Sequence, residues 1–400
     1  MNTAIGGSSA AIELADLQPP PDRPAPIGRE ELDARLGRAR ALCAQSGAGA
    51  LLVTAGASLR YFTGVAWGAT ERLVALLLPV DGEAIVVCPA FERGSLKASL
   101  AVQASLALWQ EDESPAALVA SLLDARGIKA VALDPLLPFA AYDDLRRAAP
   151  TLTFASAQPI IDACRGRKSA AELALMRYAK QLTLQVHRRA ARILRRGITT
   201  GEVRRFIDAA HRACGADNGS SFCAVQFGVA TAYPHGVPGE QALADNELVL
   251  IDTGCQINGY NSDITRTYVY GEPTAQHRRI WAIEHEAQAA AFAAVRPGVP
   301  CEAIDAAARA VLERHGLGPD YALPGLPHRT GHGIGLSIHE GPYLVRGDRT
   351  PLAPGMCFSN EPMIVLPDTF GVRLEDHFYV TDTGAAWFTE PSVSIEQPFA

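Results

Sequence analysis

Residues 246–269, NELVLIDTGCQINGYNSDITRTYV, decide the fold of the second half of the chain. The first seven residues are rich in aliphatic side chains and end in the carboxylate of Asp252, which is typical of a strand. Gly254–Gly259 supplies a turn, and a second β-rich run comes after it with Asp263 near its start. The stretch therefore predicts a β-hairpin in which the two aspartates, eleven residues apart, point inward.

The last quarter of the chain repeats this placement of acids. Met356–Glu361 has a strand pattern that ends in a carboxylate, and Glu375 lies fourteen residues after Glu361. Between the aspartates and these acids lie residues 327–340, PHRTGHGIGLSIHE, which hold too many glycines for a helix. This segment presents its histidines from a loop or strand edge: His328, His332 and His339.

Two Asp, two Glu and one His make an oxygen-rich set with a single nitrogen. Such a set suits a pair of divalent ions, Mn, Co, Fe or Zn, better than a structural cysteine-based zinc. Taken singly, an acid after a strand is more often a turn residue or a helix cap, and a glycine-flanked histidine is usually structural. It is the ordered combination that indicates a metal centre.

An internal repeat surrounds these residues. Leu194–Ile198 and a helix that ends at Gly215 are echoed by Val295–Val299 and a helix that ends at Gly316. The glycines at both ends of the two units are 101 positions apart, as from 197 to 298 and from 215 to 316. A constant offset indicates a duplicated unit and a domain with pseudo-twofold symmetry, between whose halves a two-metal centre fits.

The chain before this repeat has a different character. Helical spacing of apolar residues from Leu32 to Cys43, strand-like runs at 50–55, 73–80, 84–89 and 130–134, and a helical pattern over 115–126 predict an α/β domain. This part contains none of the ten histidines. We expect a proline-rich flexible arm over residues 1–28, an N-terminal domain over 29–161 and a catalytic domain over 162–400, opened by a capping box at Ser169.

The amino-acid composition disfavours several classes of binding partner. The 36 Lys and Arg against 43 Asp and Glu give a net charge of −7 without basic runs, which disfavours nucleic acid. The absence of a long apolar stretch or of signal-peptide character disfavours a membrane and export. The eight cysteines lack close pairs, so we expect reduced thiols in the cytoplasm. Dinucleotide-loop, zincin and nucleophile-elbow motifs are absent as well.

Five strings in order resemble one family. They are Ile251-Asp252-Thr253-Gly254, Ser262-Asp263-Ile264-Thr265-Arg266-Thr267, Gly331-His332-Gly333-Ile334-Gly335-Leu336, Asn360-Glu361-Pro362 and Val372-Arg373-Leu374-Glu375. The chain is similar to the pita-bread metallopeptidases: prolidase, aminopeptidase P, methionine aminopeptidase and creatinase. Leu59–Gly64 and the helix after Ser169 extend the likeness to a creatinase-like N-terminal domain. The resemblance implies an α+β pita-bread catalytic domain with a pseudo-twofold repeat.

The resemblance also implies the roles of individual residues. The metal ligands would be Asp252, Asp263, His332, Glu361 and Glu375, with Asp263 and Glu375 bridging two ions that share an attacking hydroxide. Glu361 would also take a proton as base. His235 and His339 would hydrogen-bond the substrate and the oxyanion, and His328 would line the pocket for the residue after the scissile bond. Arg373 would orient its neighbours, unless it is a solvated strand arginine.

These implied roles lead to an expected function. We expect a dinuclear metallopeptidase, most similar to bacterial Xaa-Pro dipeptidase (prolidase), with manganese as the first choice of metal and a dimer or higher homo-oligomer as its assembly. An Xaa-Pro aminopeptidase that acts on longer peptides is the nearest alternative. A creatinase-like C–N hydrolase, and a binding protein that has lost its metals, are the readings from other classes.

Overall fold

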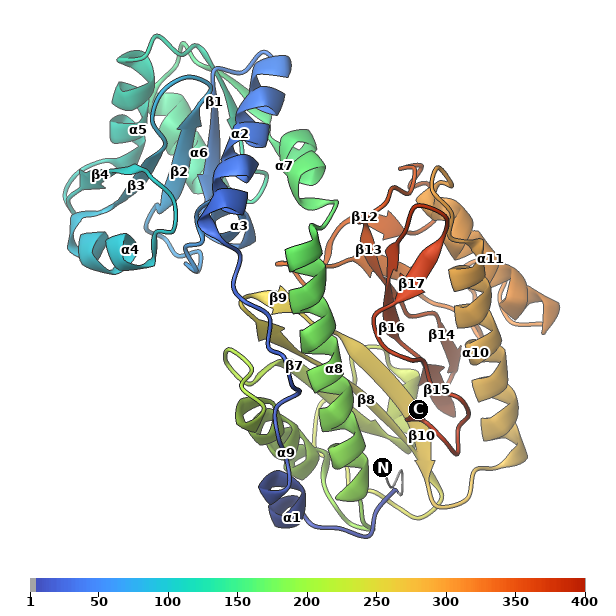
Figure 1. The fold of residues 1–400 in the computed structure, drawn as a ribbon. Helices are drawn as coiled ribbons and strands as arrows, with labels where there is room; N and C mark the ends of the chain where they lie inside the picture. Colours follow the sequence, from blue (N-terminus) through green and yellow to red (C-terminus); the bar gives the residue numbers. More distant parts are fainter. Residues whose placement is uncertain (1–4, 400) are drawn as a thin grey trace. The chain divides into compact units, whose positions relative to one another are not determined.

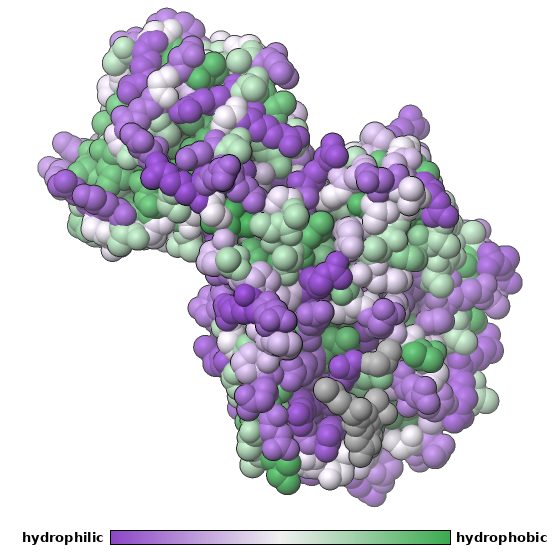
Figure 2. All heavy atoms as spheres, in the orientation of Figure 1, coloured by the Kyte–Doolittle hydropathy of each residue, from purple (hydrophilic) through white to green (hydrophobic). Residues whose placement is uncertain are grey.

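The computed structural model describes residues 5–399, which form two compact units (Figure 1). Residues 26–166 make the N-terminal unit, and residues 5–25 together with 167–399 make the C-terminal unit. The chain passes from one unit to the other after Gly166, a few residues beyond the predicted domain start at 162. Polar side chains are spread over much of the visible face of both units (Figure 2).

The N-terminal unit is the predicted α/β domain. Its six-stranded sheet has the order β4-β3-β2-β1-β5-β6, in which β1 pairs antiparallel with β2 and parallel with β5. The central strands are buried along their whole length because helices cover the sheet. The strands are β1 (Ala50–Thr54), β2 (Ala75–Pro79), β3 (Ile85–Pro89), β4 (Ser105–Trp109), β5 (Ala130–Leu133) and β6 (Thr153–Ser156).

The helices of this unit lie around the sheet (Figure 1). The two predicted helices are present as α2 and α5, and four further short helices were not predicted. Of the strands, the edge strands β4 and β6 were also not predicted, since β6 has mostly exposed side chains and no apolar alternation. The helices are α2 (Arg29–Gln45), α3 (Ala57–Thr63), α4 (Arg93–Ser99), α5 (Pro115–Asp124), α6 (Phe139–Ala148) and α7 (Gln158–Arg165).

The C-terminal unit has the predicted α+β pita-bread architecture. Figure 1 shows its strands between α8 and α9 on one side and α10 and α11 on the other. One sheet has the order β10-β8-β7, a second has the order β12-β11-β13-β16-β17, and β14 pairs with β15. The helices are α1 (Ala10–Ala15), α8 (Ala170–Arg192), α9 (Thr200–Ala213), α10 (Ala275–Ala294) and α11 (Cys301–Arg314).

The strands of this unit carry the predicted acids. They are β7 (Ser220–Phe227), β8 (Glu247–Ile257), β9 (Tyr260–Asn261), β10 (Ile264–Tyr270), β11 (Gly331–Gly333), β12 (Glu340–Leu344), β13 (Cys357–Asn360), β14 (Met363–Leu366), β15 (Phe370–Arg373), β16 (Asp376–Val380) and β17 (Ala385–Trp387). An apolar core formed by α10, α11 and the second sheet packs against these strands. No helix of the described residues is both long and apolar enough to cross a membrane.

The predicted internal repeat is confirmed. Helices α9 and α11 have the same length, and both of their ends are offset by 101 positions. Gly197 and Gly298, one before each helix, have φ of 80° and 85°. Each donates its N–H over 2.8 Å to a leucine carbonyl, that of Leu243 or Leu352. The two halves therefore share their backbone hydrogen bonding as well as their helices.

The hairpin with the two aspartates is present, but its turn is shorter than predicted. Strand β8 continues to Ile257, and the chain reverses at Asn258 and Gly259, whose φ angles of 49° and 80° fit an Asn-Gly turn. Gly254 lies inside the strand. A Cβ there would come within 1.9 Å of the Ser262 carbonyl oxygen, so this glycine permits a close backbone approach instead of a turn.

The sequence predicts a flexible arm over residues 1–28, of which the first four lie outside the described residues. Residues 5–25 contain α1 and are part of the C-terminal unit. Glu13 on α1 is fully buried and pairs with Arg189 (2.8 Å) and Arg192 (2.9 Å) on α8. Tyr178 donates its hydroxyl to the Pro20 carbonyl at 3.0 Å. Composition missed this docking because the partners of the arm lie more than 150 residues away.

Candidate metal centre

The five residues named by the resemblance come together from both halves of the C-terminal unit. Asp252 lies on β8, and Asp263 lies between β9 and β10. His332 lies on β11, Glu361 comes directly after β13, and Glu375 joins β15 to β16. Ligand atoms of His332, Glu361 and Glu375 lie within 4.8 Å of one another, and Asp263 belongs to neighbouring groups of the same size.

A backbone bridge joins the two halves at this point. Thr265 and Glu375 pair as an isolated antiparallel bridge, in which the Glu375 N–H donates to the Thr265 carbonyl at 3.1 Å. The Thr265 hydroxyl donates to Glu375 Oε2 at 2.8 Å. These two bonds fix both the backbone and the carboxylate of Glu375 against β10, the strand after Asp263.

His332 is held so that one ring nitrogen faces the acids. Its backbone N–H donates to Ser359 Oγ at 2.8 Å, and Nδ1 lies 3.0 Å from the Gly333 carbonyl oxygen. Nε2 is then directed at Glu361 Oε1 (3.0 Å) and Asp263 Oδ2 (3.8 Å). A ring anchored through one nitrogen on a carbonyl, with the other toward carboxylates, is the usual arrangement of a metal-binding histidine.

The electrostatics show how unfavourable the bare carboxylates are. Burial, followed by the charges of neighbouring carboxylates, raises the pKa of Asp263 and of Glu375 well above their ordinary values. Burial also raises the pKa of Asp252, although the Arg373 cation opposes this. Burial acts in the same direction on Glu361, but the hydrogen bond and charge of His332 outweigh it and hold the pKa of Glu361 below its ordinary value.

The donor set fits divalent cations. Among the described residues, Asp252 Oδ1, Asp263 Oδ1 and Glu375 Oε1 are buried and have no hydrogen-bond partner. Buried carboxylate oxygens without partners are costly, and a divalent ion removes that cost by binding them. Four carboxylates and an imidazole are ligands that such ions accept.

Arg373 is a positioned residue and not a solvated strand arginine. Its side chain is only 4% exposed, and Nη2 lies 2.5 Å from Asp252 Oδ2. Nε donates to Thr265 Oγ1 at 3.1 Å, and Nη1 donates to the Pro234 carbonyl at 3.1 Å. Arg373 therefore links an acid of the centre to the loop that carries His235.

The three other predicted histidines surround the centre at different depths. His235 and His339 are exposed, and His328 is half-buried. The rings of His332 and His339 are 4.1 Å apart between centroids. Desolvation of the ring by neighbouring groups lowers the pKa of His339 to about 4, and the charge of His332 lowers it further. Burial likewise lowers the pKa of His328, so both imidazoles are neutral at pH 7.

Comparison with known proteins agrees with this geometry. Residues 174–382 match the model of metallopeptidase family M24, and residues 35–166 match the creatinase/prolidase N-terminal domain. The chain is 37% identical over 356 residues to the probable dipeptidase PepE of Mycobacterium tuberculosis, covering 88% of this chain and 92% of that protein.

Solved structures extend the match to the whole fold. The dipeptidase PepE of Mycobacterium ulcerans superposes with a TM-score of 0.82 at 35% identity and covers 92% of this chain and 97% of its own. An Xaa-Pro dipeptidase from Bacillus anthracis gives 0.80 at 28% identity, with coverage of 89% and 97%.

The chain belongs to metallopeptidase family M24. It is therefore a metallopeptidase of the dipeptidase and prolidase type, and the family implies divalent metal ions at the carboxylate cluster. The predicted fold, with a creatinase-like domain before a pita-bread domain, is confirmed.

Several residues around the M24 centre were not found by sequence reasoning. Arg266 and Asp376 form a fully buried ion pair at 2.7 Å. Gln288 donates to the carbonyls of Asn360 and Leu374, the residues just before Glu361 and Glu375. No spacing rule identifies these partners, because Gln288 comes from α10, more than 70 positions from either carbonyl.

Two more unpredicted groups are buried beneath the acids of the M24 centre. Lys180 on α8 is fully buried and donates to the Asn261 carbonyl at 3.0 Å, and burial lowers its pKa to about 8. His377 on β16 is fully buried too, and burial and then the charge of Lys180 lower its pKa well below the ordinary value. Its imidazole is therefore neutral.

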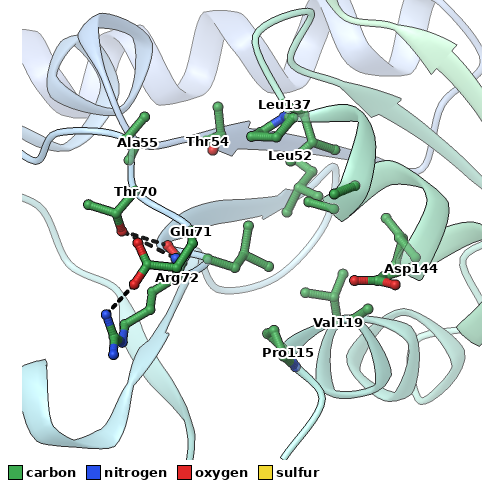
Figure 3. Close-up of a pocket in the computed structure, with 17 residues that line it drawn as sticks. Leu52, Thr54, Ala55, Thr70, Glu71, Arg72, Pro115, Val119, Leu137 and Asp144 are labelled. Atoms are coloured by element: carbon green, nitrogen blue, oxygen red, sulfur yellow. Dashed lines mark hydrogen bonds and ion pairs between the residues drawn. The ribbon is translucent and has the colours of Figure 1, made fainter. Parts of the chain in front are cut away.

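A cavity of about 190 Å³ lies within the N-terminal unit (Figure 3). Figure 3 shows Arg72 hydrogen-bonded to Thr70 and to Glu71 on one side of it, and Pro115 and Val119 on another. Its lining is largely apolar and contains none of the metal-ligating groups of the described residues. The groups of potential metal ligands among the described residues therefore lie in the C-terminal unit.

The Glu375 carboxylate should destabilise the metal-free chain and stabilise the metal-bound chain, and Glu375→Gln should separate these two effects. The metal-free variant should be at least as stable as the parent, because one of four mutually repelling buried carboxylates is neutralised. The parent should gain about 2.7 kcal/mol at a free metal concentration of about 100 Kd, whereas Glu375→Gln should lose this gain. Thermal unfolding with and without manganese measures both.

The exposed Glu272 of the same unit provides the matched control for this charge change. Glu272→Gln should retain the full metal-dependent rise in Tm. A Glu375→Gln variant that keeps the same rise would contradict the placement of Glu375 in the metal centre.

Proposed function

We propose that this M24 enzyme is an Xaa-Pro dipeptidase with a dinuclear metal centre. The observation that carries the proposal is the convergence of Asp263, Glu361, Glu375 and His332, with Asp252 next to Asp263 and the exposed His235 and His339 near this cluster. Similarity to the Xaa-Pro dipeptidase of Bacillus anthracis and to the prolidase of Thermococcus sibiricus, at 29% identity and a TM-score of 0.82, supports this substrate class.

The residues that would hold the two ions are Asp252, Asp263, His332, Glu361 and Glu375, of which Asp263 and Glu375 would be common to both. Manganese is the proposed metal because most of the donors are hard carboxylate oxygens. Bound divalent ions supply Lewis acidity, which polarises a carbonyl and makes water acidic near neutral pH. Side chains of the protein would carry out proton transfer and would stabilise the oxyanion.

Glu361 is the proposed base. Its low pKa keeps it ionised at neutral pH, so one oxygen is available to accept the proton of the attacking water. Ser359 Oγ donates to Oε1 at 3.0 Å and fixes the direction of the carboxylate. Arg373 holds Asp252 in place and does not itself touch the substrate in this proposal.

His235 and His339 are the proposed donors to the oxyanion. A neutral imidazole carries one N–H, and His339 is neutral at pH 7. Both side chains are exposed, as groups that meet a substrate must be. His328, half-buried beside them, is proposed to line the pocket for the second residue.

An X-Pro bond suits this arrangement. The tertiary amide has no N–H that an enzyme can anchor, and the ring obstructs approach from that side. Polarisation of the carbonyl by ions and histidines requires no such N–H. We also propose a cytoplasmic enzyme, which the eight free cysteines and the absence of disulfides among the described residues support.

A homo-oligomer, a dimer or a larger assembly, is part of the proposal. The N-terminal unit contains no histidine and no metal-ligating group among the described residues, so it brings no chemistry of its own. We expect it to complete the active-site mouth of a second copy. Sedimentation at micromolar concentration should show at least a dimer, and a monomeric mass would contradict this expectation.

His235→Ala should lower kcat by roughly 10²–10³ because a donor to the oxyanion acts mainly in the transition state. Metal content should stay at two ions per chain, as measured by elemental analysis. His315→Ala is the control, since His315 is an exposed histidine paired with Glu286 at the C-terminal end of α11. Parallel losses of metal and rate in His235→Ala would identify a ligand instead.

Substrate comparison tests the dipeptidase assignment. Ala-Pro should be cleaved roughly 10- to 200-fold faster than Ala-Ala, because the pyrrolidine ring fills an apolar pocket that alanine leaves partly empty. Amidation of Ala-Pro removes a charge-assisted contact worth about 1.5–3 kcal/mol, which should lower kcat/KM by at least tenfold. Steady-state kinetics with manganese measures both ratios.

Ala-Pro-Ala completes the comparison. A dipeptidase should cleave it poorly, whereas an Xaa-Pro aminopeptidase is nearly indifferent to the residues after proline. Equal rates on Ala-Pro, its amide and Ala-Pro-Ala would replace the dipeptidase by the aminopeptidase while leaving the metal centre intact.

A further inference from the structure

His377 is a fully buried histidine that the predicted ligand set does not include. It lies on β16 directly opposite Ser359 of β13, the residue whose hydroxyl bonds Glu361 and the backbone of His332. Its Nε2 lies 3.8 Å from Glu375 Oε1. Ligand atoms of Asp263, Glu375 and His377 lie within 4.8 Å of one another.

Each member of this group has a polar atom without a partner. Among the described residues, both ring nitrogens of His377, Glu375 Oε1 and Asp263 Oδ1 are buried and lie in no well-formed hydrogen bond, although the Asp263 backbone lies near enough to the His377 ring to oppose the lowering of its pKa. A buried imidazole normally has a partner, because a buried polar atom that has lost its hydrogen bonds to water without gaining others destabilises the fold. Unsatisfied atoms from three side chains that face one another indicate something that binds all three.

The spacing favours a cation between them over a direct hydrogen bond. A hydrogen bond from Nε2 to a carboxylate would need about 2.7–3.2 Å, and 3.8 Å is too long. Two donors that bind one ion at about 2.0–2.2 Å each lie roughly 3–4 Å apart. The distance between His377 and Glu375 falls in that range.

Among the described residues there are three groups of potential ligands, and two of them share Glu375. His332, Glu361 and Glu375 form the first of these two, and Asp263, Glu375 and His377 form the second; the third group contains Asp263, His332 and the exposed His339. Asp252 is in none of these groups, and its Oδ2 is taken by Arg373. Each of the two groups that share Glu375 contains one imidazole.

We propose that His377 is a sixth ligand of the metal centre and binds, together with Asp263 and Glu375, the ion that His332 does not bind. The inference rests on the proposed dinuclear centre. It gives each of the two ions one nitrogen ligand, so the centre is less dominated by oxygen than the sequence motifs imply. Because imidazole suits cobalt and zinc better than manganese, His377 raises the affinity for cobalt relative to manganese.

Proton NMR of the cobalt-loaded full-length chain tests this directly. High-spin cobalt(II) shifts the exchangeable ring N–H proton of a bound histidine far outside the normal range, so such signals count imidazole ligands. The parent should show two, from His332 and His377. His377→Leu should lose one of them, whereas His211→Leu, which removes a buried histidine bonded to Thr183 and Ser220, should keep both.

His339→Leu is a second control, because His339 also lies close to His332 and Asp263. It should retain both signals. Loss of a signal in His339→Leu instead of His377→Leu would overturn the proposal. The parent spectrum decides by itself if His377→Leu does not fold, since two bound cobalt ions with a single shifted N–H signal exclude a second imidazole.

Calorimetric titration of the metal-free chain provides the second measurement. Loss of a residue that only supports a metal ligand lowers metal affinity by about 10- to 100-fold. Loss of a direct ligand in His377→Leu should therefore lower the affinity for the second cobalt ion at least tenfold. The affinity for manganese should fall less. Equal losses of affinity for cobalt and manganese in His377→Leu would contradict the proposed selectivity. Failure of the parent to bind any cobalt would contradict the dinuclear centre together with the role of His377.

Discussion

The rest of this structure depends on the repulsion among four carboxylates in a nearly closed site. Asp263 and Glu375 are at most 4% exposed, and burial together with the neighbouring carboxylates raises the pKa of both above the ordinary value. A chain that brings such groups together must hold them by other contacts, since they would otherwise move apart. Arg373 restrains Asp252 directly, and Lys180 places a second buried cation beneath the acids.

The framework that resists this repulsion is a buried polar network at the junction of the two halves. Arg266 and Asp376 pair with no exposure to solvent, and Arg266 also donates to the Glu375 carbonyl at 2.9 Å. Gln288 binds the backbone before Glu361 and before Glu375. A buried ion pair is weak support for overall stability, since an apolar replacement is often as stable. The contribution of the network here is to fix the positions of Glu361 and Glu375.

Sequence reasoning identified the parts of the centre that have local signatures. Asp263, Glu361 and Glu375 lie at the ends of strands, whereas Asp252 lies within β8, and the glycines around His332 are needed because a Cβ at Gly331 would come within 2.1 Å of the Ser359 carbonyl oxygen. The same reasoning placed Gly254 in a turn, since a glycine that permits close approach looks like a turn glycine in a single chain. Thr265 and His377 were missed because their role depends on partners such as Glu375, and the bond from Thr265 spans 110 positions.

The duplication explains the scaffold of the centre but not its chemistry. Helices α9 and α11 are offset by 101 positions, whereas the leucines that accept from Gly197 and Gly298 are 109 apart (352 minus 243). Asp252 and Glu361 are also 109 apart, so these acids follow the shared backbone pairing. The second half therefore holds eight more residues between its helix and its strand, in the segment that carries His328, His332 and His339. Two equivalent halves supply the carboxylates, whereas His332, from the longer segment, and His377, from β16, both come from the second half, so the proposed nitrogen ligands belong to one half of a site whose acids come from both.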